Sequence, residues 1–364
     1  MNIKLITIGM LSTALLFSSC KKDEEEEVTT PKPTLSVSDT YSADGYDPAT
    51  ATVVTAIGEL SSEMKTADPT KQSETVTSAE LVTIYQSGSL SLKDIASEQF
   101  NTWATGTLFP EFEKASGTGG DVFDLGTPGN TPDGGAAYKH LFSGSPVELE
   151  QLIEKGSFGG ACFSYVKSNL FATPSSVSSD QLDQALVLYG SEPTFEEKGL
   201  SAKYAGKRIY TGETTYHDQI SYEFRKAQSA ISQGLQSDKV AAVNAITKLW
   251  EEAIAAQTIY YLSGVASDLA FTPDYSITED YNTVADAIHG WSEGVAFLSG
   301  FYGVDGSTIT DAQIVSILAK INGSMTGNYT PLTLIGDFDE LAELTTGINE
   351  LADAYGISVE SALK

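Results

Sequence analysis

Apolar side chains recur at three- and four-residue spacing along most of this 364-residue chain. Val53, Ile57, Leu60 and Met64, for example, form one stripe of an amphipathic helix. No strong run of alternating apolar and polar residues, the pattern of a half-buried strand, is present. The sequence therefore predicts an all-α helical bundle. Helices are expected at residues 49–64, 78–86, 91–105, 146–171, 178–189, 213–235, 238–262, 283–301, 310–321 and 338–355.

The expected helix at 146–171 has a distinct start and an unusual interior. Ser145 is suited to cap it, Pro146 suits a first turn, and Glu148 and Glu150 suit the positive end of the helix dipole. Four small residues cost helix propensity and indicate close approach of a neighbouring helix. They are Gly156, Gly159, Gly160 and Ala161.

Two segments lack this periodicity. Residues 106–138 are rich in Gly, Pro, Asp and Thr and are expected to form one long surface loop. Residues 190–211 are polar and are expected to be irregular.

The start of the chain has the three parts of a secretory signal. Lys4 gives a positive charge, residues 5–17 are mainly apolar, and Ser18 and Ser19 are small. Because the apolar run is shorter than the roughly twenty residues that span a bilayer, it is not expected to be a membrane helix. The sequence LFSSC ending at Cys20 resembles a bacterial lipobox, which implies lipid attachment to Cys20. The alternative is ordinary secretion with a free cysteine.

The residues after Cys20 are expected to form a flexible tether over 20–40. The sequence KKDEEEE at 21–27 is a charge block of the kind that stays solvated. It resembles the export tag of surface lipoproteins from Bacteroidetes-type bacteria, although it is also compatible with a plain hydrophilic tether. We expect a lipid-anchored, cell-surface protein of the outer membrane, whose folded domain spans 41–364.

Composition limits the partners of that domain. The chain has 21 Lys and Arg against 49 Asp and Glu, a net charge of −28. This charge argues against binding nucleic acid, whose phosphates need a basic surface. Cys162 is left without a disulfide partner and lies in an apolar stretch, so it is expected to be a small buried hydrophobic residue.

Several segments, in order, resemble the domain of unknown function 4856 family of Bacteroidetes lipoproteins. They are QLIEKGSFGGA at 151–161, LWEEAIAA at 249–256, YYL at 260–262, HGWSEGVAF at 289–297, the opening 41–85 and ADAYG at 352–356. The resemblance covers most of the chain after the tether. It implies a family rather than an activity, because the activity of that family is not established.

One segment departs from the family pattern. Family members usually carry His-His-Trp-Asp-Glu-Ala where this chain has DQLDQA at 180–185. Both histidines and the glutamate are missing, so this position cannot perform their chemistry. The same segment is similar to residues 289–297, which suggests two related helical halves. The pattern is remotely similar to imelysin-like lipoproteins, which are associated with iron uptake and carry a His-Glu motif on a helix.

His289 and Glu293 are the strongest candidate site residues. Their four-residue spacing places them on one helical face, where they could supply two ligands to a divalent metal or iron. The alternative is a buried histidine that pairs with a carboxylate and supports packing. Nothing in the sequence predicts that other candidates join them. These are His140, His217, Glu213, Asp218 and Glu223. The aromatic residues Tyr260, Tyr261 and Trp291 are expected in the core.

Enzyme signatures are missing from the sequence. It contains no His-Glu-x-x-His, no Gly-x-Ser-x-Gly and no phosphate-binding loop ending in Gly-Lys-Ser/Thr. We therefore expect a binding protein for a small ligand or partner protein, linked to nutrient uptake, rather than an enzyme. The alternative is an imelysin-like protein that handles metal, iron or haem through His289 and Glu293, and a cryptic hydrolase is the third hypothesis.

Overall fold

The computed structural model describes residues 34–42, 46, 48–68, 75–118, 133–270 and 278–364. The expected signal segment, Cys20 and most of the tether therefore lie outside the described residues. From Leu35 onward the chain forms one compact unit of packed helices, which confirms the all-α prediction. None of the described helices is long and apolar enough to span a membrane.

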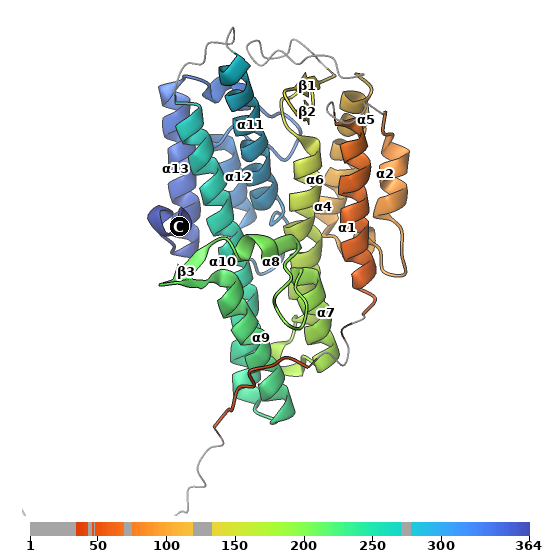
Figure 1. The fold of residues 1–364 in the computed structure, drawn as a ribbon, viewed down its shortest axis with the longest axis vertical. Coiled ribbons are helices and arrows are strands. Elements are labelled where there is room, and N and C mark those ends of the chain that lie inside the picture. Colours follow the sequence, from red (N-terminus) through yellow and green to blue (C-terminus); the bar gives the residue numbers. More distant parts are fainter. Residues whose placement is uncertain (1–33, 43–45, 47, 69–74, 119–132, 271–277) are drawn as a thin grey trace, which may run out of the picture. The chain divides into compact units, whose positions relative to one another are not determined.

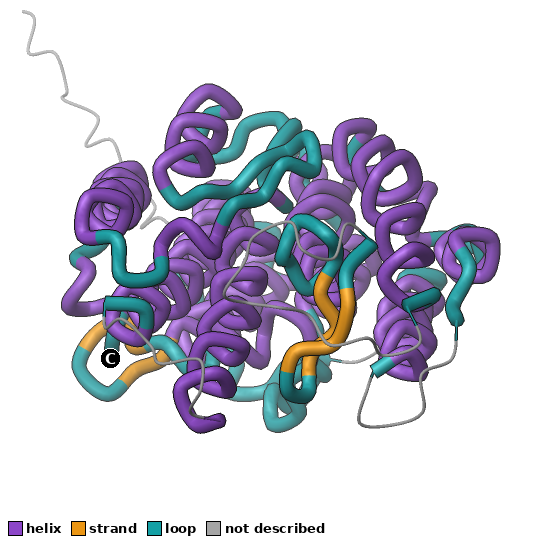
Figure 2. The backbone as a smooth tube through the Cα atoms, turned by 90° about the horizontal axis from the view of Figure 1, so that it is seen from above, coloured by secondary structure: helices purple, strands orange, loops and turns teal. Residues whose placement is uncertain are grey.

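The helices form a bundle whose long axes run roughly parallel (Figure 1). Figure 2 views the bundle from above, with two small hairpins between and beside the helices. The helices are α1 Ala51–Met64, α2 Ser78–Tyr85, α3 Leu92–Ile95, α4 Glu98–Trp103, α5 Phe109–Ser116, α6 Leu149–Ser157, α7 Ser179–Tyr189, α8 Leu200–Ala205, α9 Tyr216–Ser232, α10 Gln236–Asp268, α11 Thr278–Ser299, α12 Asp311–Lys320, α13 Phe338–Tyr355 and α14 Val359–Ala362. The strands are β1 Gly135–Ala137, β2 His140–Phe142, β3 Ile209–Thr211 and β4 Thr214–Thr215.

Helix α10 is the central element of the bundle. It packs against α9, α11 and α13, and Trp250 in its middle is fully buried. The ring of Trp250 meets Tyr189 of α7 and Phe163 edge-on at centroid distances of 5.0 and 5.4 Å. Aromatic pairs in this geometry stabilise a core beyond the effect of area burial alone. Cys162, beside this cluster, is fully buried as expected.

Several helix starts are closed by reciprocal capping of a hydroxyl residue and the residue three positions later. Ser178 accepts from the backbone N–H of Gln181, whose side chain accepts from the Ser178 backbone in return. Thr215 and Asp218 form the same reciprocal arrangement at the start of α9. Each such capping box satisfies N–H groups that the first helical turn cannot pair internally.

The expected helix at 146–171 is shorter and less regular than predicted. Helix α6 begins at Leu149, so Glu148 rather than Ser145 occupies the capping position and Pro146 lies outside the helix. After Ser157 the chain continues through two π-helical turns, η3 Phe158–Phe163 and η4 Val166–Leu170. The extra residue in each π turn shifts the following side chains around the helix axis, which simple helical periodicity does not anticipate.

Two expected loops contain regular structure. Residues 106–138 were predicted as one loop, but a π turn at Ala104–Leu108, helix α5 and strand β1 occupy parts of them. Phe109 and Phe112 drive α5 inward because both rings are buried. Residues 119–132 lie outside the described part. The segment 190–211 contains α8 and β3 rather than irregular chain alone.

Gly159 lies directly against another backbone, as the small residues of this segment predict, whereas Gly156 and Gly160 lie against the Phe100 side chain. A Cβ on Gly159 would lie 2.8 Å from the carbonyl carbon of Gly300, just after α11. A Cβ on Gly300 would likewise lie 2.8 Å from the carbonyl oxygen of Gly156. Glycine at these positions therefore sets the separation of α6 and α11.

Replacing Gly159 tests this constraint. Gly159→Ala is expected to lower the free energy of unfolding by about 1–3 kcal/mol, because its methyl group must displace backbone rather than a mobile side chain. Gly264→Ala in α10 is the control, since its Cβ would meet nothing within 4 Å. That change is expected to raise stability by about 0.5–1 kcal/mol through helix propensity. Denaturant unfolding measures both, and equal stability of the two variants would contradict the close contact.

Candidate metal site

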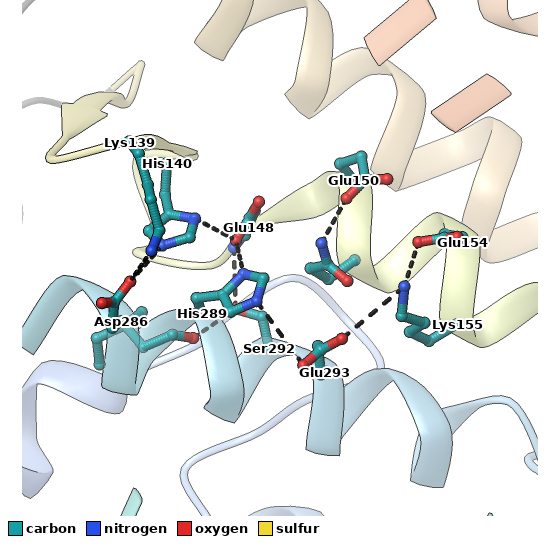
Figure 3. Close-up of polar contacts among 12 residues, drawn as sticks. Lys139, His140, Glu148, Glu150, Glu154, Lys155, Asp286, His289, Ser292 and Glu293 are labelled. Atoms are coloured by element: carbon teal, nitrogen blue, oxygen red, sulfur yellow. Dashed lines mark hydrogen bonds and ion pairs between the residues drawn. The ribbon is translucent and has the colours of Figure 1, made fainter. Parts of the chain in front are cut away.

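The candidate site joins the β1–β2 hairpin, the start of α6 and the middle of α11. Asp286, His289 and Glu293 share one face of α11, because their spacings of three and four residues match the helical repeat. His140 opens β2 and Glu148 immediately precedes α6. Figure 3 shows these five side chains converging from segments far apart in the sequence.

The hairpin fixes the position of His140. Strand β2 pairs with β1 in antiparallel register, with His140 opposite Ala137. Gly134, just before β1, has φ +103°, and a Cβ there would lie 2.2 Å from the carbonyl oxygen of Phe142. Only glycine permits this close approach. His140 is consequently held at 6 % exposure against the bundle.

Backbone contacts hold Glu148 against α11. Its backbone N–H donates to the Ser292 hydroxyl at 3.0 Å, and that hydroxyl donates to the carbonyl of Ile288 at 2.8 Å. Because Ser292 lies one turn beyond His289, this contact brings the Glu148 carboxylate beside the His289 ring.

The two imidazole rings meet at this carboxylate. His289 Nδ1 lies 2.5 Å from Glu148 Oε2, and His140 Nδ1 lies 3.2 Å from the same oxygen. The rings of His140 and His289 stack with centroids 4.4 Å apart and planes at 18°. One ligand atom from each of the three residues lies within 4.8 Å of the others. Elsewhere in the described residues no comparable group of three or more His, Cys, Asp or Glu is found.

A second carboxylate accompanies each histidine on its opposite side. His140 Nε2 lies 2.9 Å from Asp286 Oδ1, which also pairs with Lys139 Nζ at 3.0 Å. His289 Nε2 lies 3.7 Å from Glu293 Oε2. Carboxylates in this position fix the tautomer and orientation of histidines that bind metals.

Burial and charge act in opposite directions on these groups. Burial would raise the pKa of Glu148, but hydrogen bonds from His140 and His289 lower it to about 2. Burial would lower the pKa of His289, but the hydrogen bond and charge of Glu148 raise it overall. The pKa of Asp286 is lowered because its bonds to His140 and Lys139 outweigh its burial. Without a bound metal, the cluster is therefore a partly buried ion-pair network.

The cluster opens onto a pocket of about 360 Å³. Lys65 and Asp68 line it from the end of α1, and Phe112 and Leu141 supply apolar wall. Two histidines and one carboxylate are a ligand set for zinc or iron that leaves coordination positions open. The pocket therefore provides space for water or a small ligand beside these three residues.

The other candidates from the sequence lie elsewhere. His217 stacks on Tyr189 with centroids 5.8 Å apart, and its Nε2 lies 3.1 Å from the Phe195 carbonyl. Asp218 caps α9, and Glu223 pairs with Lys226 at 3.1 Å. Glu213 is exposed beside the second hairpin. None of these residues reaches His289, so their structural roles account for them.

Helical spacing predicts that His289 and Glu293 lie together, but no local pattern connects His140 or Glu148 to them. Glu148 was assigned to the helix dipole, whereas its carboxylate faces the two histidines. Asp286 had a usable signal, because it precedes His289 by three residues. The aromatic prediction holds for Trp291, which is fully buried, and fails for Tyr260, which is 40 % exposed beneath the Arg208 guanidinium.

The chain matches no protein-family model, and no curated protein or solved structure is significantly similar to it. The site is therefore interpreted from its own geometry.

The opposed pKa shifts predict how the metal-free site responds to pH. Glu148 stabilises the fold above its ordinary pKa of 4.5, and this contribution is lost as pH falls towards about 2. His289 stabilises the fold below its ordinary pKa of 6.5, and its contribution is lost as pH rises through the raised value. The ion pair should therefore matter most between these two ordinary pKa values.

Glu148→Gln tests this window in protein stripped with EDTA. At about pH 5.5 the variant is expected to lose about 1–3 kcal/mol of unfolding free energy, with smaller losses at about pH 3.5 and 9. Denaturant unfolding gives the values. Glu111→Gln is the control, because Glu111 pairs with Lys114 on the surface. A loss that does not vary with pH would contradict the ion-pair assignment.

Proposed function

We propose that this protein binds a divalent transition metal, zinc or iron, through His140, Glu148 and His289. The arrangement that carries the proposal is the pair of histidines sharing one carboxylate, each backed by a carboxylate on its other nitrogen. Carboxylates in this second position are typical of histidines that bind metals.

The spacing of the ligand atoms is close to that of a metal site. Atoms bound to one zinc ion at about 2.0–2.1 Å lie about 3.3–3.5 Å apart in a tetrahedron. The His140–Glu148 separation of 3.2 Å is near this value, and the His289–Glu148 separation of 2.5 Å must widen by about 1 Å. Because Nδ1 of His289 must lose its proton, metal uptake should be weaker in acid.

Metal titration of the folded domain tests this assignment. One equivalent of Zn²⁺ or Fe²⁺ is expected to bind with micromolar or higher affinity, and His140→Asn, Glu148→Gln and His289→Asn should each lose at least about a hundredfold. Asp286→Asn and Glu293→Gln should lose about 10–100-fold, since they act through the histidines. Calorimetry and metal analysis after dialysis measure these effects.

His217→Asn is the matched control, because it removes a buried histidine that does not contact the site. It should retain full metal affinity, and circular dichroism should confirm that all variants fold. Wild-type protein that binds neither ion, together with a His289→Asn variant that is merely less stable, would leave the cluster as a packing network.

We further propose that the domain is lipid-anchored through Cys20 at the outer-membrane surface. The signal-like residues 1–19, the cysteine that follows them and the acidic tether support this proposal. A metal-binding domain on such a tether is suited to nutrient uptake at the cell surface, which agrees with the imelysin-like hypothesis.

Cys20→Ser tests the anchor. The variant is expected to lose labelled palmitate, to remain uncleaved and to leave the detergent-rich fraction on phase separation, because no thiol remains for acylation. Cys162→Ala is the control and should keep its lipid, since Cys162 is fully buried in the bundle. Lipid labelling that persists in Cys20→Ser would contradict the assignment.

A further inference from the structure

A second and larger cleft lies between α1, the end of α7 and the segment that leads into α8. Its volume is about 820 Å³, within the usual range of small-molecule sites. None of the residues lining it also lines the pocket beside the histidines. Its occupant is therefore a separate question from the metal.

One wall of the cleft is the loop of residues 190–199, whose two ends are joined by a backbone hydrogen bond. Gly199 N–H donates to the Gly190 carbonyl at 2.7 Å, and a Cβ on Gly190 would lie 2.4 Å from the Gly199 carbonyl oxygen. The Tyr46 hydroxyl donates to the Ser191 carbonyl at 2.7 Å. Phe195 and Leu200 adopt positive φ values of 61° and 37° without being glycine. Such strained positions cluster at binding sites, where the surrounding fold holds them.

The lining of the cleft combines hydrocarbon with an excess of negative charge. Val54 and Ile57 of α1 line it together with Val187 and Leu200. Three carboxylates and one ammonium group line the same space. They are Glu154, Glu192, Glu197 and Lys198.

Glu154 has a positively charged partner, whereas the charges of Glu192 and Glu197 affect Tyr46 in the cleft. The partner of Glu154 is Lys155, which does not line the cleft. The pKa of Tyr46 is raised by burial and then by the charges of Glu192 and Glu197. Their negative potential therefore extends to the phenol that lines the cleft.

Gly58 keeps one wall open. It lies in the interior of α1, where glycine costs about 0.5–1 kcal/mol relative to alanine. A Cβ at this position would meet nothing within 4 Å, so helix packing does not require the glycine. Its effect is to leave space in the cleft.

We propose that this cleft binds a small aliphatic amine. The hydrocarbon chain lies between Val54, Ile57 and Leu200, and the ammonium group pairs with Glu192 and Glu197. An anionic ligand of the same length is disfavoured by these carboxylates, and a strongly polar ligand leaves the apolar walls uncovered.

The test compares n-octylamine with octanoate, which has the same chain length and the opposite charge, by calorimetry on the folded domain. Octylamine is expected to bind one site with submillimolar affinity, and octanoate at least about tenfold more weakly. Glu197→Gln should weaken octylamine binding by about threefold to tenfold, because one carboxylate remains.

The variants Gly58→Leu and Gly58→Ala test whether octylamine binds in this cleft. Leucine fills the cleft without a steric clash inside α1 and should weaken octylamine binding at least about tenfold, whereas alanine should preserve most of it. Absence of octylamine binding, equal affinity for octanoate, or full binding by Gly58→Leu would each overturn the proposal. His289→Asn should bind octylamine normally, which separates this result from the metal assignment.

Discussion

The backbone contact between η3 and the end of α11 positions the side chains of the candidate metal site. At Gly159 and Gly300 the two segments touch without intervening side chains. At the other end of α6, Glu148 reaches α11 through the Ser292 hydroxyl. The two contacts bracket α6 and fix its direction along α11. His289 lies one turn before Ser292 on α11 and therefore faces the Glu148 carboxylate.

A string of charged side chains occupies the space between these contacts (Figure 3). Glu293 lies 3.8 Å from Lys155 Nζ, and Lys155 also pairs with Glu154. Burial would lower the pKa of Lys155, but the surrounding carboxylates, Glu154 first among them, raise it overall. The ammonium group also faces the rings of Phe158 and Tyr204 at 5.9 and 5.6 Å. A buried charge with this many partners stays ionised, and removing one partner leaves the others unbalanced.

The sequence predicted what depends on local chemistry. The stripe from Val53 to Met64 requires only neighbouring residues and occurs as expected. The helix expected at 178–189 also forms, and its capping box depends on residues of a single turn. The position of Glu148 depends on where α6 begins. Its start is set by tertiary contact with Ser292 rather than by the favourable capping chemistry of Ser145.

The contact between His140 and His289 cannot be predicted from local sequence patterns. It requires a hairpin within a segment that reads as loop, and it joins residues 149 positions apart in the chain. The π turns after α6 cannot be predicted in this way either, because they rotate the later side chains around the helix axis without changing the composition of the segment. Helical spacing could supply only the α11 half of the site, namely Asp286, His289 and Glu293.

Helix α7 carries the stretch DQLDQA at 180–185, and its polar side chains have partners within the fold. Gln181 closes the capping box, while Asp183 accepts a hydrogen bond from Tyr41 at 2.6 Å in the buried interior. Tyr41 follows an extended segment in which the backbone N–H of Ser38 donates to Ser229 of α9, and that of Ser36 donates to Gln233 just after this helix. Helix α7 thus holds the incoming chain, whereas α11 carries Asp286, His289 and Glu293 of the candidate site.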